Sequence, residues 1–383
     1  MTNNKDKKVL NVPNLRFPEF TGEWKKERLD EIAELSKGIG ISKEQLSSNG
    51  NPCILYGELY TKYKSEIISE VISKTNIEKN KLKHSKQNDV IIPCSGETAV
   101  DIAVARCVPF DNVLLGGDLN IIRLHKYDGA FMAYQLNSKR KIEIAKLAQG
   151  VSVVHLYGEN LKSINTFNPS LQEQQKIVRL LSLLDERIKV QNKIIEKLKS
   201  LIKGIAQHCI KELTSGNTYV KLGDICQITT GKLDANAQVD NGIYPFFTCA
   251  EQPFKIDSFA FDTEALLISG NGANLGYINY YHGKFNAYQR TYVLDTFSEN
   301  IQYIKWALKV LLPKRIAIEK SSSNTPYIVL STLSNLRLPI PNKSNQCHIA
   351  KLMQSLERKL SSQIALNGFY NKLKQYLLRQ MFI

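Results

Sequence analysis

Polar side chains that could hydrogen-bond to a nucleic acid occur in short polar segments in both halves of the chain. Amide and guanidinium groups read base edges, whereas hydroxyl and amine groups contact phosphates. A plain polar loop is the alternative at each place. The segments are Lys37–Lys43, Tyr56–Tyr63, Ser95–Thr98 and Gly150–Ser152 in the first half, and Thr230–Lys232, Asn271–Asn274, Tyr288–Arg290 and Ser321–Thr325 in the second.

Within these segments we expect the contacts to come from amide, hydroxyl, aromatic and cationic side chains. Arg290 is the candidate for reading a guanine. The full set is Lys37, Ser42, Lys43, Tyr56, Tyr60, Lys62, Ser95, Thr98 and Ser152, and then Thr230, Lys232, Asn271, Asn274, Tyr288, Gln289, Arg290, Ser322 and Asn324.

Motifs for catalysis are missing. Gly231-Lys232 and Gly283-Lys284 lack the first glycine and the hydroxyl of a phosphate-binding P-loop, and Gly270–Gly276 is misspaced for a dinucleotide fingerprint. Phe167–Ser170 lacks the second proline and the aromatic residue of an amino-methyltransferase motif. No His-Glu-x-x-His occurs, and we interpret the seven scattered cysteines as free thiols. The sequence therefore predicts neither a catalytic nor a metal site.

The net charge of +15 favours a polyanionic partner, of which nucleic acid is the commonest. Ten of these fifteen excess charges fall in residues 171–214 and 343–383. Solvated helix faces are one interpretation of this distribution. The others are contact with phosphates or with an acidic protein.

The elements that position these residues are duplicated. Leu29–Gly38 returns as Leu222–Gly231, and the helical run near Gln174 returns near Gln346. Each half thus predicts one globule followed by one long helix. The halves differ in length mainly between Gly231 and Ala265, where we expect the two globules to differ.

Both long helices have a seam of apolar residues at alternating three- and four-residue spacing, which is typical of a coiled coil. We expect them to pair within the chain as a rod of roughly 60 Å. An antiparallel pair is favoured, since a parallel one would need a long return. The first predicted seam is Ile177, Leu181, Leu184, Ile188, Gln191, Ile195, Leu198, Ile202, Ile205 and Cys209; the second is Ile349, Leu352, Leu356, Leu360, Gln363, Leu366, Tyr370, Leu373, Leu377 and Met381.

Short strand patterns and turns place both globules in the α+β class. Buried strands are predicted at 89–93 and 265–269, each running into a glycine turn, and later strands at 119–124 and 291–294. Helices are expected at 130–148 and at 301–312, the latter ended by Pro313. The predicted domains are 1–168 and 215–342 for the globules, and 169–214 and 343–383 for the helices.

No apolar run approaches the ~20 residues that span a bilayer. The charged start of the chain is unlike a signal peptide. We expect a cytoplasmic protein without a membrane partner.

The chain resembles the specificity subunit of type I restriction-modification systems over essentially its full length. The resemblance is carried by Pro13–Phe20 with Trp24-Lys25, by Leu29–Ala33, and by Glu173–Val178 running into Leu183–Asp185. The second copy departs, because Asn345–Ile349 keeps only the Gln and the Ile of the helix-entry motif.

This resemblance implies two target-recognition domains held apart by two helices. Each domain would read half of a split, asymmetric DNA sequence, and the helix pair would set the spacer. Two methyltransferase subunits would dock on it to methylate adenine with S-adenosylmethionine, and restriction subunits would add ATP- and Mg-dependent cleavage. The chain itself would bind no cofactor. The residues expected to dock the methyltransferase are Gln174, Gln175, Lys176 and Gln346.

Three other interpretations stay open from the sequence. The first is a basic coiled-coil scaffold that binds only proteins. The second is an enzyme in its own right. The third is a specificity subunit of a methyltransferase that lacks ATP-driven restriction.

Overall fold

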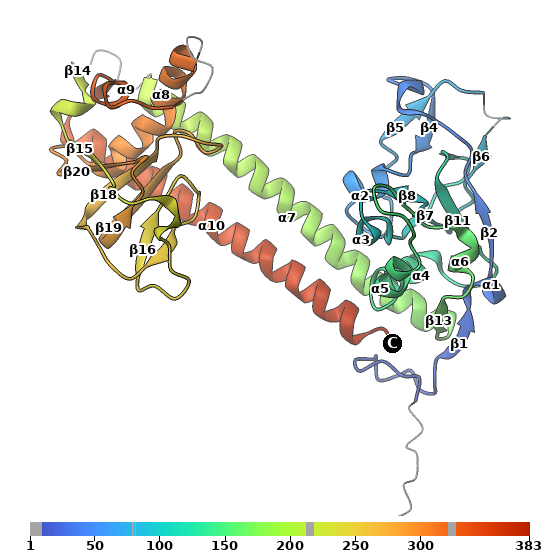
Figure 1. Ribbon diagram of the computed structural model, residues 1–383. Coiled ribbons are helices and arrows are strands. Elements are labelled where there is room, and N and C mark those ends of the chain that lie inside the picture. Colours follow the sequence, from blue (N-terminus) through green and yellow to red (C-terminus); the bar gives the residue numbers. More distant parts are fainter. Residues whose placement is uncertain (1–9, 79, 81, 212–217, 321–326) are drawn as a thin grey trace, which may run out of the picture. The chain divides into compact units, whose positions relative to one another are not determined.

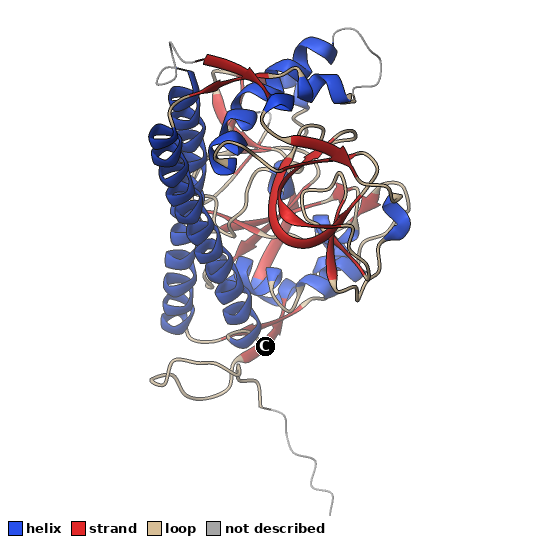
Figure 2. Cartoon of the chain, turned by 90° about the vertical axis from the view of Figure 1, so that its left-hand side faces the viewer, coloured by secondary structure: helices blue, strands red, loops and turns tan. Residues whose placement is uncertain are grey.

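The computed structural model describes residues 10–78, 80, 82–211, 218–320 and 327–383 (Figure 1). The described chain forms two compact units. The first comprises the residues up to Asn192 together with Leu366–Ile383, and the second comprises Lys193–Ala365. Each unit mixes helices and strands (Figure 2), as the α+β prediction requires. None of the described helices is long and apolar enough to cross a membrane.

Both long helices contribute to both units. Helix α7 (Leu171–Lys211) begins in the first unit and ends in the second, and α10 (Lys343–Gln380) does the reverse. Pro169 and Pro341 stand before them, where a missing amide proton costs nothing. Because the units share these helices, the domain boundaries expected at 168 and 342 stay a prediction.

The first unit is built around a four-stranded antiparallel sheet in the order β2-β11-β7-β9. Every residue of β7 is buried, as the continuous apolar run predicted. A five-stranded sheet, β3-β5-β4-β10-β6, and the pairs β1–β13 and β8–β12 surround it. The strands are β1 (Lys25–Arg28), β2 (Ala33–Lys37), β3 (Leu46–Ser47), β4 (Asn51–Ile54), β5 (Ser73–Thr75), β6 (Lys83–His84), β7 (Asp89–Pro93), β8 (Ser95–Gly96), β9 (Arg106–Val108), β10 (Leu114–Leu115), β11 (Leu119–Leu124), β12 (Val154–His155) and β13 (Asn165–Asn168).

Apart from α7 and α10, the helices of the first unit are short. Helix α4 packs apolar residues such as Met132 and Leu136 on the central sheet, against Val90 and Ile122. The predicted helix at 130–148 is in fact two helices, because the chain turns at Ser138–Arg140. The bounds are α1 (Leu29–Ile32), η1 (Lys43–Gln45), α2 (Glu58–Thr61), α3 (Ala99–Ile102), α4 (Gly129–Asn137), α5 (Lys141–Lys146) and α6 (Gly158–Leu161).

The second unit has one six-stranded sheet, in the order β15-β20-β18-β19-β16-β17, and the pair β14–β21. Helix α8 buries Tyr303, Ile304 and Leu308 against Leu266 and Ile268 of β18. The elements are β14 (Thr218–Lys221), η3 (Leu222–Asp224), β15 (Gln227–Thr230), η4 (Ala235–Ala237), β16 (Tyr244–Phe247), β17 (Phe254–Ile256), β18 (Phe261–Ser269), β19 (Ile278–Ala287), β20 (Thr291–Asp295), α8 (Ile301–Lys320), α9 (Leu330–Ser334) and β21 (Arg337–Ile340).

The duplication is confirmed in these elements. Strands β2, β7 and β11 of the first unit correspond to β15, β18 and β20 of the second, with the same neighbours. The length difference also falls where the sequence placed it. Between β2 and β7 the first unit inserts η1, α2 and the strands β3 to β6, whereas the second unit has only η4, β16 and β17 between β15 and β18.

Two further predictions of local structure were wrong. Helix α8 continues through Pro313 to Lys320, although the proline cannot donate an intrahelical hydrogen bond. Leu312 and Ile316 are buried on either side of it, so core packing outweighs that loss. Ser95–Gly96 forms strand β8, paired with β12, instead of a plain glycine turn.

The seam of α7 is confirmed, since each of its ten predicted positions is buried or half-buried. Within the first unit the two helices run antiparallel. Asp185 contacts Lys374. About two turns further along α7, Asn192 contacts Asn367, which lies earlier in α10. Within the second unit, Leu198 and Ile202 of α7 share a core with Ile349 and Met353 of α10.

The seam of α10 was predicted wrongly at two positions. Leu352 and Leu366 are exposed, whereas Leu373 is half-buried and packs on the core with Leu377. The positions that continue the spacing from Ile349 are Met353, Asn367 and Lys374, and Met353 is fully buried. Two of these three residues are polar, so an apolar pattern does not reveal them.

Candidate nucleic-acid interface

In the first unit, three backbone hydrogen bonds hold the tripeptide Gly116–Asp118 and the adjoining Leu119 at the start of β11. The Gly38 amide donates to the Leu119 carbonyl (2.9 Å) and the Cys94 amide to the Asp118 carbonyl (2.7 Å). The Gly116 amide donates to the Ile54 carbonyl (2.9 Å). A side chain at residue 38 would collide with the Gly116 carbonyl, so glycine is required there. We call Gly116–Asp118 the first tip.

Two predicted residues meet at the first tip through a residue that was not predicted. Lys37 Nζ lies 3.1 Å from Asp118 Oδ1, and Ser95 Oγ donates to Asp118 Oδ2 at 3.1 Å. The hydrogen bond to Asp118 raises the pKa of Lys37 above its ordinary value. The lysine therefore stays charged at any physiological pH.

The first tip has further predicted residues as neighbours. A Cβ at Gly96 would lie 3.4 Å from the hydroxyl of Tyr60, which places that tyrosine beside β8. Strand β8 pairs with β12, and the Gln149–His155 bridge closes the exposed loop that carries Ser152. Next to it, the rings of His155 and Tyr157 stack with centroids 6.2 Å apart. Lys37, Tyr60, Ser95 and Ser152 thus come from segments that meet at one edge.

In the second unit, the equivalent tripeptide Tyr288–Arg290 is held at the start of β20. The Gly270 amide donates to the Arg290 carbonyl (2.8 Å) and the Tyr288 amide to the Phe247 carbonyl (2.9 Å). The Gly231 amide donates to the Thr291 carbonyl (3.3 Å). We call Tyr288–Arg290 the second tip. Three of the four DNA-contact segments predicted in this half, Thr230–Lys232, Asn271–Asn274 and Tyr288–Arg290, therefore meet at or beside the second tip.

Side chains at the second tip form a small network. Gln289 Nε2 donates to Asp234 Oδ1 at 2.7 Å. Asn274 Nδ2 donates to the Cys249 carbonyl at 3.0 Å, and the Cys249 thiol contacts Asn271 Oδ1, also at 3.0 Å. The side chains of Thr230, Lys232 and Arg290 are exposed.

Other predicted residues have structural partners or lie elsewhere. Lys62 pairs with the buried Glu58 (2.7 Å), and Thr98 caps α3 by accepting from the Asp101 amide. Ser42 and Lys43 are exposed at the start of η1, and Tyr56 packs on a core of the first unit. Ser322 and Asn324 lie outside the described residues.

Sequence reasoning missed Asp118, Asp234 and Cys249. Carboxylates are not expected at a DNA-binding surface, because phosphates repel them. The sequence did contain a signal for Asp118. Asp118 and Arg290 are separated by the same number of residues as the equivalent pair Gln174 and Gln346, so the repeat relates Asp118 to the predicted Arg290. For Asp234 and Cys249 the sequence offers no comparable signal, because they lie in the segment where the halves differ.

Gln174 and Gln346 are buried, and this leaves neither side chain available to a partner subunit. Gln174 Oε1 accepts from the Asp128 amide (3.0 Å), and its Nε2 donates to the Pro169 carbonyl (2.9 Å). Gln346 makes the same bonds with the Asn300 amide (3.0 Å) and the Pro341 carbonyl (2.9 Å). We assign both a structural role, joining the start of the long helix to the N-cap of α4 or α8. The other two predicted docking residues, Gln175 and Lys176, are exposed.

Exposed Gln175 and Lys176 line a groove of about 460 Å³ together with Phe17, Arg179, Leu180 and Leu183. Lys176 pairs with Glu19 and lies over the ring of Phe17, 4.6 Å from its centroid. The N-terminal segment is fixed there by Arg16, which forms an ion pair with the buried Glu173 (2.7 Å).

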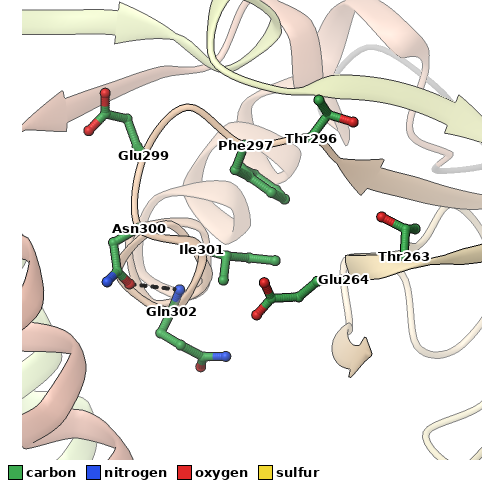
Figure 3. A pocket seen from close by; sticks show the side chains of 8 residues that line it. All are labelled: Thr263, Glu264, Thr296, Phe297, Glu299, Asn300, Ile301 and Gln302. Carbon is green, nitrogen blue, oxygen red and sulfur yellow. Dashed lines mark hydrogen bonds between the residues drawn. The ribbon is translucent and has the colours of Figure 1, made fainter. Parts of the chain in front are cut away.

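A polar pocket of about 520 Å³ lies at the far end of the second unit's central strands from the second tip. In it, Asn300 Oδ1 accepts from the Gln302 amide and caps α8 (Figure 3). Tyr280 donates to the pocket carboxylate of Glu264 (2.7 Å). The pocket is thus next to the Gln346 contact and apart from the tip. The described residues contain no cluster of side chains that could hold a metal ion.

Comparison with known proteins agrees with the duplicated architecture. The family model described as "Type I restriction modification DNA specificity domain" matches residues 21–200 and again 214–366. The chain belongs to this family. The specificity family thus accounts for both halves, and each match contains one tip.

Individual relatives match to different extents. The type I restriction enzyme EcoDI specificity subunit of Escherichia coli is 41% identical over 143 residues, which cover 37% of this chain and 32% of that protein. The MjaIX specificity subunit of Methanocaldococcus jannaschii is 25% identical, over 64% of this chain and 66% of that one. The chain thus matches from a third to two thirds of the length of these relatives. A putative type I specificity subunit of Mycoplasma genitalium is 23% identical over 94% of both chains.

The fold is similar to that of a solved structure. The crystal structure of a type I restriction-modification S subunit from M. genitalium superimposes with a TM-score of 0.67 at 20% identity. The alignment covers 97% of this chain and 99% of that chain.

Proposed function

We propose that this chain is the DNA sequence-recognition subunit of a type I restriction-modification enzyme. Each unit would read one half of a bipartite target. The observation that carries the proposal is that each family-matched segment holds a tip, fixed by the same backbone hydrogen bonds, at the same place in the fold. A tip held by backbone hydrogen bonds can place side chains against base edges without loss of loop entropy.

The two tips predict an asymmetric target. Gly116, Gly117 and Asp118 in the first unit correspond to Tyr288, Gln289 and Arg290 in the second. Groups of different charge and hydrogen-bonding capacity select different bases. The two half-sites should therefore differ in sequence.

We further propose that methyltransferase subunits dock on the outer side of the helices. In the first unit, Leu183, Val190, Phe369 and Tyr376 are each about half exposed, and each directly precedes a seam position. Equivalent offsets in an antiparallel pair lie on the same side of it. These four residues therefore form one apolar strip, which we call the outer strip.

The domain of the first unit occupies the opposite side of the helix pair. Val178, Leu378 and Phe382, which directly follow seam positions, pack with Trp24 and Phe131. The outer strip is thus left for a partner. Its apolar side chains suit an amphipathic helix, and the groove beside Gln175 and Lys176 continues the same surface.

In this proposal the chain has no catalytic role. Adenine methylation with S-adenosylmethionine, and cleavage with ATP and Mg²⁺, would be performed by the methyltransferase and restriction subunits. Two methyltransferase subunits, one for each unit, would match the duplication.

Co-expression with the methyltransferase encoded beside this gene tests the proposal. We expect long-read methylation sequencing of the host to give one split motif with adenine methylation in both halves. Purified complex should bind that duplex at least ten times more tightly than a scrambled one. Methylation without a split motif, or binding without sequence preference, would contradict the proposal.

The docking surface has its own test. Phe369→Asp and Leu183→Asp place a charge in the outer strip and should abolish co-purification of the methyltransferase, because a buried unpaired charge is costly. Lys372→Asp, on exposed α10 surface outside the strip, is the matched control. Retained co-purification of both strip variants would rule out this surface.

A further inference from the structure

The two tips are held by the same set of backbone hydrogen bonds. The first joins the glycine after β2 to the first residue of β11 (2.9 Å), and in the second unit the glycine after β15 to the first residue of β20 (3.3 Å). The second joins the residue after β7 to Asp118 (2.7 Å), and in the second unit the residue after β18 to Arg290 (2.8 Å). The third joins Gly116 to Ile54 and Tyr288 to Phe247, at 2.9 Å in each unit. Asp118 and Arg290 therefore occupy equivalent positions.

Asp118 is presented as a fixed hydrogen-bond acceptor. Its backbone has a φ of 56°, in the left-handed region, which aspartate and asparagine adopt more readily than most residues other than glycine. Lys37 and Ser95 each hold one carboxylate oxygen, and each oxygen keeps a further lone pair. In a DNA groove, a carboxylate acceptor is suited to the N4 amino group of cytosine.

Gln289 is presented as an oriented amide. Asp234 accepts one Nε2 proton, which fixes Oε1 and the second proton on the other side of the amide. The Gln289 backbone amide also donates to the Leu233 carbonyl (2.9 Å), so the residue is held at two points. An amide held this way offers the acceptor and donor pair that matches N6 and N7 of adenine.

Arg290 completes the second tip. Its backbone carbonyl accepts a hydrogen bond from the Gly270 amide. Its guanidinium is exposed and forms no ion pair with any residue in the described ranges. A free guanidinium at a tip can donate two bonds to O6 and N7 of guanine. The second tip is thus suited to purines and the first to a base with an exocyclic amine.

We propose that these equivalent tripeptides are the specificity-determining elements of the two units. The first tip selects cytosine through Asp118, positioned by Lys37 and Ser95. The second tip selects adenine through Gln289, positioned by Asp234, and guanine through Arg290. This inference rests on the proposed function. It adds which residues distinguish the bases of each half-site and which base each residue selects.

Selection from a library of duplexes with randomised half-sites tests the proposal, using the complex of this chain with its methyltransferase. Asp118→Asn keeps the side-chain shape, and asparagine tolerates a left-handed backbone. We expect about a tenfold or greater loss of preference for cytosine at one position of the first half-site. Gln289→Leu and Arg290→Ala should each cause a similar loss at one purine of the second half-site.

The half-site that does not belong to the substituted tip is an internal control. Its preferences should stay unchanged in each variant. Glu34→Gln in β2 and Asp262→Asn in β18 are matched controls, because both are exposed sheet residues outside the tips. A positioning role for Asp234 predicts that Asp234→Ala weakens the adenine preference less than Gln289→Leu does.

The outcomes separate the two proposals. If the unsubstituted complex selects no split motif, the proposed function fails. If it selects a split motif and the tip variants select the same one, or change the wrong half-site, the assignment of the tips is overturned while the proposed function stands.

Discussion

At the scale of single residues, a buried charged cluster fixes the end of α10 to the first unit. Lys374 Nζ lies 2.5 Å from Glu66 and 2.6 Å from Asp185, and Tyr134 donates to the same aspartate (2.7 Å). Burial raises the pKa of Asp185, whereas the nearby ammonium group of Lys374 opposes that rise. One lysine thus compensates two buried carboxylates at a seam position.

We predict that Lys374→Met lowers the free energy of unfolding by about 3–5 kcal/mol, because it removes the ion-pair partner of two buried carboxylates. Urea unfolding followed by circular dichroism measures the change. Lys372→Met, two residues earlier on exposed surface, should change it by less than about 0.5 kcal/mol. Equal effects of the two substitutions would refute the role of the cluster.

Glu357 of α10 performs an equivalent function in the second unit. It accepts from Lys305 (2.7 Å) and Lys309 (3.1 Å) of α8. Burial alone would raise its pKa, but the bonds to the two lysines lower it overall. In the second unit the lysines lie on α8 and the carboxylate on α10, whereas in the first unit the lysine lies on α10. The ion pairs that attach α10 to the two units are therefore not interchangeable.

The lowered pKa of Glu357 predicts a dependence of stability on pH. A carboxyl group with a depressed folded pKa stabilises the fold above its unfolded pKa, and this contribution is lost as the pH falls through the folded value. Glu357→Gln should therefore remove part of the loss of stability seen below about pH 4.5. Thermal unfolding from pH 3 to 7 checks this. Curves that stay parallel for the variant and the parent protein would exclude the linkage.

At the scale of elements, the pattern of apolar residues identified strands, helices and the duplication, but it failed where two patterns overlap. Leu352 and Leu366 of α10 look like seam positions but are exposed, and the neighbouring Met353 and Asn367 continue the seam instead. A helix with an apolar strip on its outer side has two rows of apolar residues, the outer strip and the seam. Periodicity alone cannot tell which of them faces the other helix.

The corrected seam predicts opposite outcomes for two adjacent residues. Met353→Ala should cost about 2–4 kcal/mol in unfolding free energy, because it empties a fully buried site. Leu352→Ala should cost less than about 1 kcal/mol, since that side chain is 45% exposed. Chemical unfolding of the two variants in parallel measures both. A larger cost at Leu352 would restore the seam predicted from the sequence.

The tips show which part of the site sequence could predict. Glycines at 38, 231 and 270 and the polar residues around them marked the segments that meet at the tips, because close backbone approach requires glycine. Asp118 and Asp234 escaped notice because their roles depend on partners, Lys37 and Gln289, that only folding brings into contact.

At the scale of the whole molecule, the two halves repeat the scaffold and differ in the tips and in the insertion before β7. The repeated contacts of Gln174 and Gln346 attach each long helix to its own domain through α4 or α8. A change in helix length should then be transmitted to the domains and not absorbed at a loose joint. In the proposed function, the helices would determine the spacer between half-sites.

Removal of one heptad from each helix tests this role. Deletion of residues 195–201 from α7 and 358–364 from α10 keeps the seam phase, because Asp185–Lys374 and Asn192–Asn367 set the pairing, and it leaves the outer strip intact. Seven residues at ~1.5 Å correspond to roughly 10 Å, or about three base pairs. We expect methylation sequencing to show the same half-sites with a spacer shortened by about that amount. Deletion from α7 alone should instead abolish methylation, because it leaves seven residues of α10 unmatched. An unchanged spacer with the paired deletion would mean that the helices do not set it.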